Sequence, residues 1–154
     1  MKLRVVAVGR DRSGLYAPGV EEYAGRISRY VPFELVEVSE ARRHAGTPRA
    51  KDEEGEALLA RIGTRDRIIL LDERGVEETS DVFAQRVGRW LAGGRDVALV
   101  LGGADGLAAA VRARGDETLA LSRLTLAHRL ARLVLVEQLY RALTILRGEK
   151  YHKA

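Results

Sequence analysis

Hydrophobic residues fall into short continuous runs that alternate with longer segments of helical periodicity. The runs predict five strands, at residues 3–8, 33–38, 67–72, 96–101 and 119–122. Helices are predicted at residues 18–30, 51–62, 79–93 and 107–114, and a long last helix opens at His128 and extends to residue 146. Strands that alternate with helices favour an α/β fold with a mostly parallel sheet flanked by helices. No repeat or linker interrupts the pattern, so we expect one domain over residues 1–154.

Two polar segments between these elements are predicted to be irregular. Residues 73–75 follow the third strand and are expected to turn the chain, and the basic segment 39–48 is expected to be a mobile loop. Trp90 and Phe83 share a helical stripe and are predicted core residues.

The last helix is apolar on almost every side between residues 134 and 146. A helix of this kind is usually covered all round, and one sheet covers only one face. We therefore expect a partner subunit to cover the other face, in a two-fold dimer. Inside this helix, Glu137 needs a partner, which Arg141 at i+4 can supply.

Composition narrows the class of protein. The chain has no Cys, which excludes disulfide and thiolate chemistry and fits a cytoplasmic location. It has no apolar run of membrane-spanning length and no secretory leader, so we expect no membrane association. The net charge of +4 permits a nucleic-acid partner. From residue 123 onward, seven basic residues face only two acids, so the excess lies in the last segment.

Candidate chemistry lies where strands end. The glycine-rich loop at residues 101–106 follows a strand and precedes a helix, where open α/β sheets bind ligands, although a tight strand-to-helix turn explains it equally well. Asp72 at a strand end either accepts from a ribose hydroxyl or starts a turn. His128 either shuttles a proton or has a structural role. Tyr151, His152 and Lys153 lie beyond the last helix, where we expect core packing to have little use for them. Their types suit stacking on a base and contact with phosphates.

The order of these segments resembles the SPOUT-class methyltransferases that methylate N3 of a pseudouridine in large-subunit ribosomal RNA. The resemblance rests on MKLRVVAVG at the start, LGGADGL at residues 101–107 and LALSRLTLAHRLARLVLVEQLYRALTILRGEKYHK at residues 119–153. It implies a deep C-terminal trefoil knot, S-adenosylmethionine as cofactor, no metal, a homodimer, and the assembled ribosome as substrate. The alternatives are a SPOUT methyltransferase that acts on transfer RNA and a non-catalytic nucleotide- or flavin-binding module.

The resemblance also implies roles for individual residues. The cofactor would be held by Leu71, Gly102, Leu121, Ser122, Arg123, Leu124, Thr125 and Leu126. His128 and Arg132 match the catalytic positions, and Tyr151 and His152 match the terminal pair of the family. Ala127 and Lys150 depart from the residues usual at their positions. We expect a side chain at Gly102 to collide with the cofactor, so that Gly102→Val would abolish binding and spare the fold.

Overall fold

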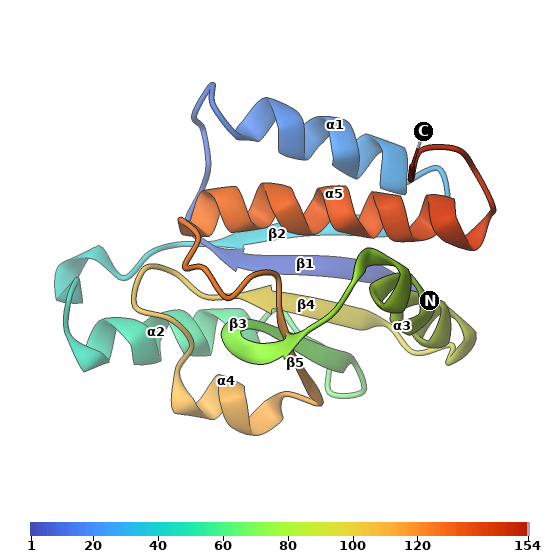
Figure 1. The fold of residues 1–154 in the computed structure, drawn as a ribbon. Helices are drawn as coiled ribbons and strands as arrows, with labels where there is room; N and C mark the ends of the chain where they lie inside the picture. Colours follow the sequence, from blue (N-terminus) through green and yellow to red (C-terminus); the bar gives the residue numbers. More distant parts are fainter. Residues whose placement is uncertain (154) are drawn as a thin grey trace.

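The carboxyl ends of all the strands lie on the same side of the sheet, because every neighbouring pair of strands runs parallel. The computed structural model describes residues 1–153, so Ala154, the last residue of the predicted domain, lies outside the described residues. The strands are β1 (Leu3–Val8), β2 (Phe33–Val38), β3 (Arg67–Glu77), β4 (Val97–Leu101) and β5 (Glu117–Ala120). Their order in the sheet is β2-β1-β4-β3-β5 (Figure 1). The predicted α/β class is confirmed.

Strand β3 is longer than the apolar pattern predicts. Leu71 and Val76 both pair with Leu119 of β5, so residues 72–75 form a bulge within the strand. The predicted strand end at residue 72, followed by a turn, is therefore wrong. Glycine is required at position 75, because a Cβ there would lie 2.8 Å from backbone atoms of Leu119.

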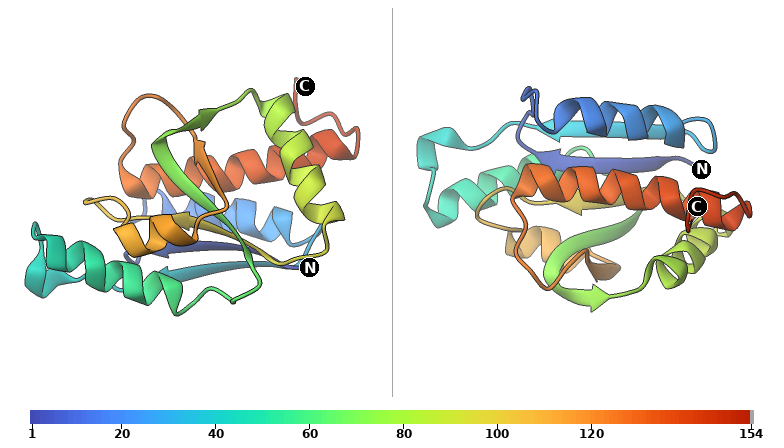
Figure 2. Two further views of the ribbon diagram at one scale, coloured as in Figure 1. Left: turned by 90° about the horizontal axis from the view of Figure 1, so that it is seen from below. Right: turned by 45° about the horizontal axis from the view of Figure 1, so that its top comes forward.

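Helices cover both faces of the sheet. They are α1 (Ala17–Ile27), α2 (Pro48–Leu59), α3 (Ser80–Ala92), α4 (Ala109–Arg114) and α5 (His128–Leu146), with a short 3₁₀ helix η1 (Arg42–His44). Helices α1, α3 and α5 pack on one face, and α2 and α4 pack on the other (Figures 1 and 2). The segment predicted as a loop at residues 39–48 thus contains one short helical turn.

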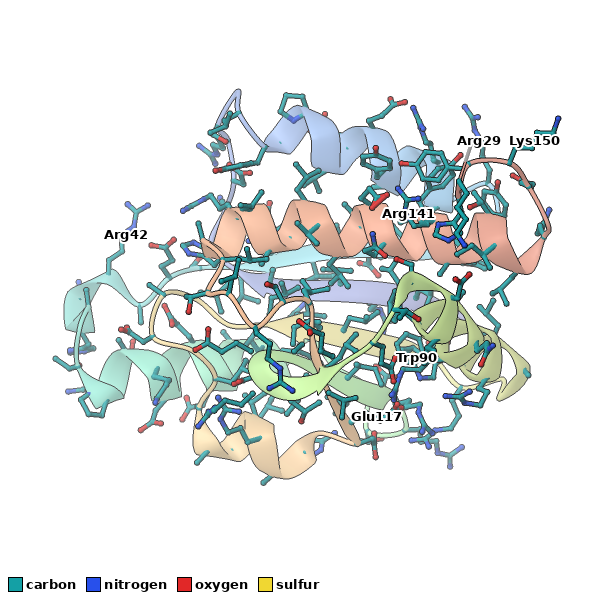
Figure 3. The ribbon with its side chains drawn as sticks, viewed as in Figure 1. Arg29, Arg42, Trp90, Glu117, Arg141 and Lys150 are labelled. Carbon is teal, nitrogen blue, oxygen red and sulfur yellow. The ribbon has the colours of Figure 1, made fainter. Side chains whose placement is uncertain are left out.

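Helix α3 shows how local signals become packing. The side chain of Thr79 caps the helix by accepting a hydrogen bond from the backbone N–H of Val82 at 3.2 Å. Phe83 and Trp90 then lie buried with their rings edge to face at 6.0 Å, which confirms their predicted core positions. The indole N–H of Trp90 donates to Glu117 of β5 at 3.1 Å, so α3 is tied to the edge of the sheet (Figure 3).

Helix α5 lies between α1 and α3 on the sheet. Leu135, Val136 and Leu139 are fully buried. Gly19 of α1 allows close approach, because a Cβ there would lie 2.9 Å from the side chain of Leu133. Helices α1 and α3 therefore supply part of the cover that was expected from a partner subunit. Within residues 1–153, no helix is both long enough and apolar enough to cross a membrane.

Candidate active site

A cavity of about 620 Å³ opens at the carboxyl ends of β3 and β4. Small-molecule sites usually have roughly 300–1,000 Å³. The β4–α4 loop forms one wall, and the segment between β5 and α5 forms another. The lining includes every residue that the resemblance assigns to the cofactor except Arg123. The structure therefore brings together residues that are far apart in the chain, at the edge where open α/β sheets bind ligands.

The glycine loop holds its shape through its own backbone. Gly106 donates a hydrogen bond to the carbonyl of Gly103 at 3.1 Å and has φ of +83°, which favours glycine. A Cβ at Gly102 would lie 2.6 Å from the carbonyl oxygen of Gly106. The expectation that Gly102→Val would spare the fold is therefore wrong. The new side chain would collide with the loop itself before it met any ligand.

The segment of residues 121–127 is fixed against β3 by hydrogen bonds. The backbone N–H of Arg123 donates to Glu77 at 3.0 Å, and the hydroxyl of Thr125 donates to Glu73 at 2.5 Å. The hydroxyl of Ser122 accepts from the N–H of Leu124 at 2.9 Å. The backbone of Arg123 thus helps to hold the segment in place, although Arg123 is exposed and does not line the cavity.

Asp72 lines the cavity as an ionised carboxylate. It accepts from the backbone N–H of Arg74 at 2.8 Å and from the guanidinium of Arg112 at 2.5 Å. Burial alone would raise the pKa of Asp72, but the hydrogen bonds from Arg74 and Arg112 outweigh burial and hold the pKa below its usual range. The cavity therefore presents a fixed negative charge beside a guanidinium, in a lining that combines leucines with charged side chains.

His128 is the first residue of α5 and lines the cavity. Burial and the neighbouring charge of Arg129 lower the pKa of His128 below its ordinary value of 6.5, so the ring is neutral at pH 7. A guanidinium can only donate, so the 3.0 Å contact from Arg129 assigns the lone pair of the neutral ring to Nε2 and its proton to Nδ1. His128 can accept a proton at Nε2 once Arg129 releases that atom.

Arg132 does not line the cavity. It is 1% exposed, and its guanidinium donates to Glu37 at 2.6 Å and to the carbonyls of Val8 and Gly9 at 3.1 and 2.9 Å. These contacts join α5, one turn after His128, to the ends of β1 and β2. Arg132 is placed to position the start of α5 rather than to touch a substrate.

The C-terminal tail lies at the opposite end of α5 from the cavity. The hydroxyl of Tyr151 lies 3.1 Å from that of Tyr23, and its ring packs 4.7 Å from that of Tyr140. Nδ1 of His152 lies 3.2 Å from the guanidinium of Arg141, which also pairs with Glu137 at 2.6 Å as predicted. The expectation that packing has little use for the tail is wrong for Tyr151 and His152. Lys153 is exposed.

Several charged residues of the cavity were not predicted from the sequence. They are Lys51, Glu73, Arg74 and Arg112. Arg112 lies in the short helix that follows the glycine loop, and this proximity in the chain was the only signal available. The other three come from α2 and the β3 bulge, which only the folded sheet brings to the cavity. Among residues 1–153, no His, Cys, Asp and Glu side chains are grouped as a metal site would need.

Comparison with known sequences gives a family match over nearly the whole chain. A family described as "Predicted SPOUT methyltransferase" matches residues 1–152. A protein of Anaeromyxobacter sp. named "Ribosomal RNA large subunit methyltransferase H" is 75% identical over 153 residues, which cover 99% of this chain and 100% of the relative. A protein of the same name from Hahella chejuensis is 41% identical over 155 residues, covering 99% of each chain.

Solved structures show the same fold at lower identity. A probable methylase family protein from Haemophilus influenzae superposes with a TM-score of 0.56 at 16% identity, over 97% of this chain and 69% of that chain. A probable methyltransferase from Bordetella pertussis has a TM-score of 0.56 at 21% identity, over 92% of this chain and 93% of that chain. Both likenesses concern the fold alone.

Proposed function

The chain belongs to the SPOUT methyltransferase family, and from this premise we propose that it transfers a methyl group from S-adenosylmethionine to N3 of a pseudouridine in large-subunit ribosomal RNA. The parallel sheet fits the trefoil-knotted architecture of the family. The observation that carries the proposal is the cavity that gathers residues 71, 102, 121, 122 and 124–128 at the carboxyl ends of the strands. Relatives over the full length carry the name of a large-subunit RNA methyltransferase.

The cavity fits S-adenosylmethionine chemically. Leu71, Leu121 and Leu126 offer apolar surface for an adenine ring, while Asp72 can accept from a ribose hydroxyl or an ammonium group. Arg112 offers a guanidinium for a carboxylate. When bound, the cofactor supplies a methyl group that its sulfonium makes electrophilic. The protein must supply alignment and an acceptor for the N3 proton.

We infer that His128 accepts that proton. It is neutral at pH 7, lines the cavity and carries its lone pair on Nε2, where Arg129 now donates. RNA entry would draw Arg129 toward phosphate and free this atom. Arg132 acts through position, because it fixes the first turn of α5 to the ends of β1 and β2.

The length of α5 supports a site shared between two subunits. The helix has 19 residues, so it spans about 28 Å at 1.5 Å per residue. Within one subunit, the tail folds back along α5 only as far as Glu137 and Arg141. Glu137 lies about 14 Å along the helix axis from His128, so Tyr151 and His152 do not reach a nucleotide bound in the cavity. A two-fold pairing along the outer face of α5 would bring the tail of one subunit to the cavity of the other. Leu130, Val134 and Ile145 remain only partly buried on this helix. A ribosomal substrate would place the homodimer in the cytoplasm.

The deciding experiment is transfer of labelled methyl to ribosomes that lack the modification, with transfer RNA assayed in parallel. We expect the ribosome to be methylated at N3 of a pseudouridine and transfer RNA to stay unlabelled. Labelling of transfer RNA alone would refute the choice of substrate. Light scattering at micromolar protein should report a dimer, and a stable monomer would refute the shared site.

Calorimetric titration with S-adenosylmethionine tests the cavity itself. Asp72→Asn should weaken binding roughly tenfold or more, because a hydrogen bond to a charged group contributes about 1.5–3 kcal/mol. Asp52→Asn, on the exposed side of α2, is the matched control and should bind like the parent protein. Equal affinities in the two variants would remove Asp72 from the site, and no binding by the parent would refute the cofactor.

A further inference from the structure

Residues 41–51, which we name the arginine arm, protrude from the body beyond β2. The arm contains η1 and the first residues of α2. In the three ribbon views it extends past the carboxyl ends of β1 and β4, on the side where α5 begins (Figures 1 and 2). Figure 3 shows Arg42 pointing away from the protein at the outer end of the arm.

The arm carries positive charge without internal compensation. Its charged residues are Arg42, Arg43, Arg49 and Lys51, with His44 beside them and no Asp or Glu between residues 41 and 51. Arg49 and His44 share Glu53 of α2, at 3.5 and 3.3 Å. Arg42 and Arg43 are exposed, and neither has an ion-pair partner among the residues that the structure describes.

Two adjacent guanidiniums without a partner repel each other and bury nothing, so the fold gains no stability from them. Their situation differs from that of Arg86, Arg112 and Arg132, each of which pairs with a carboxylate of another element. An external anion would therefore meet donors that are free of competing carboxylates.

The arm is held to the body at both ends. At one end, the backbone N–H of Ala41 donates to buried Glu54 of α2 at 3.1 Å. Within the arm, the hydroxyl of Thr47 donates to the carbonyl of His44 at 2.6 Å. Ala50 is 1% exposed, and Lys51 lines the cavity. The exposed arginines are thus connected through a short anchored segment to the mouth of the candidate active site.

We propose that the arginine arm is an RNA-binding surface, in which Arg42 and Arg43 contact phosphates of the ribosomal RNA that flank the nucleotide entering the cavity of the same subunit. This inference rests on the proposed function. Contacts of this kind position RNA without reading its sequence. The arm contributes affinity for the ribosome, and the cavity carries out methyl transfer.

The test compares Arg42→Ala/Arg43→Ala with Arg61→Ala/Arg65→Ala, a control of equal charge. Arg61 and Arg65 are exposed and lie just before β3, at the amino ends of the strands. With ribosomes that lack the modification, the arm variant should raise KM about tenfold or more and leave kcat and cofactor affinity near parental values. Loss of two phosphate contacts should also lower the slope of log affinity against log salt by about 1.4–1.8. A KM equal to that of the control, or a loss confined to kcat, would overturn the inference.

Co-sedimentation with large ribosomal subunits separates this inference from the proposed function. If the parent protein binds subunits through the arm but transfers no methyl group, the proposed function fails and the RNA surface stands. If parent and arm variant sediment equally at every salt concentration, the arm inference fails whatever the activity. A photoreactive phenylalanine analogue at position 43 should crosslink to RNA, and a crosslink only to ribosomal protein would refute the choice of partner.

Discussion

Replacement of Arg132 by methionine tests whether this buried guanidinium fixes the start of α5. The change removes an ion pair with Glu37 and two hydrogen bonds to the carbonyls of Val8 and Gly9. Removing one partner of a buried ion pair destabilises a protein by about 3–5 kcal/mol. Glu37 is partly exposed and keeps a 2.8 Å hydrogen bond from the N–H of Asp11, which favours the lower end. We expect a loss of about 3 kcal/mol, or roughly 6–12 °C in the unfolding midpoint.

Urea unfolding at fixed protein concentration measures this loss, because the stability of a dimer depends on concentration. Arg129→Met is the matched control on the same helix. Arg129 pairs with Glu40 at 3.2 Å with both side chains about a third exposed, and its second pair, with Asp11, is long at 3.8 Å. The loss should therefore be about 0–1 kcal/mol. A cycle with Glu37→Gln should show coupling of about 0.5–3 kcal/mol. If Arg132→Met unfolds like the control, or the coupling is zero, the positioning role is refuted.

Three further outcomes are expected. The acid limb of the pH–rate profile of methyl transfer should lie below pH 6.5, because burial and Arg129 lower the pKa of His128. Arg129→Met should move this limb to higher pH. An unmoved limb would assign proton transfer to another group. Truncation after Gly148 should leave cofactor affinity and the dimer intact and reduce ribosome methylation to near background, as calorimetry, light scattering and labelled transfer on one preparation will show. Tyr151→Phe, which keeps the ring, should retain far more activity than the truncation. Burial raises the pKa of Glu54 above its ordinary value of 4.5, so the stability it contributes is present below that pH and is lost as pH rises through the folded-state pKa. Glu54→Gln should therefore raise the unfolding midpoint at pH 7.5 relative to the parent and not at pH 4, and equal changes at both pH values would contradict this assignment.

Local sequence patterns determined most of the secondary structure. The strands at residues 3–8 and 33–38 have the predicted bounds, and α3 at Ser80–Ala92 differs by one residue at each end from the helix predicted at residues 79–93. The pair of Glu137 and Arg141 also formed as predicted. Each of these features depends on neighbours within one or two turns of chain, so the period of apolar residues and the nearby polar groups suffice to specify it.

Local sequence patterns predicted the cavity only in part. The glycine loop and the segment of residues 121–128 could be named from motif and resemblance, and both line it. The charges on Lys51, Glu73, Arg74 and Arg112 could not be named, and Asp72 was named without its partner. Asp72 contacts Arg112 across 40 residues of sequence. Asp72 also lies in a bulge within β3, where the apolar pattern predicts the end of the strand. The knotted threading came from resemblance, because apolar periodicity carries no information about which segment passes through which loop.

Only the tertiary structure determined the contacts of Arg132 and the tail. Arg132 reaches Val8 across 124 residues, and Tyr151 reaches Tyr23 across 128. In sequence, resemblance alone assigned Arg132 to a catalytic position, and the residue types of the tail suggested contact with RNA. In the folded subunit, the guanidinium of Arg132 binds carbonyls at the end of β1. The ring of Tyr151 packs among the aromatic side chains between α1 and α5. Periodicity fixes which face of an element is buried, but only the packing of distant elements determines which polar groups meet there, because a buried polar group must find whatever partner the neighbouring element provides.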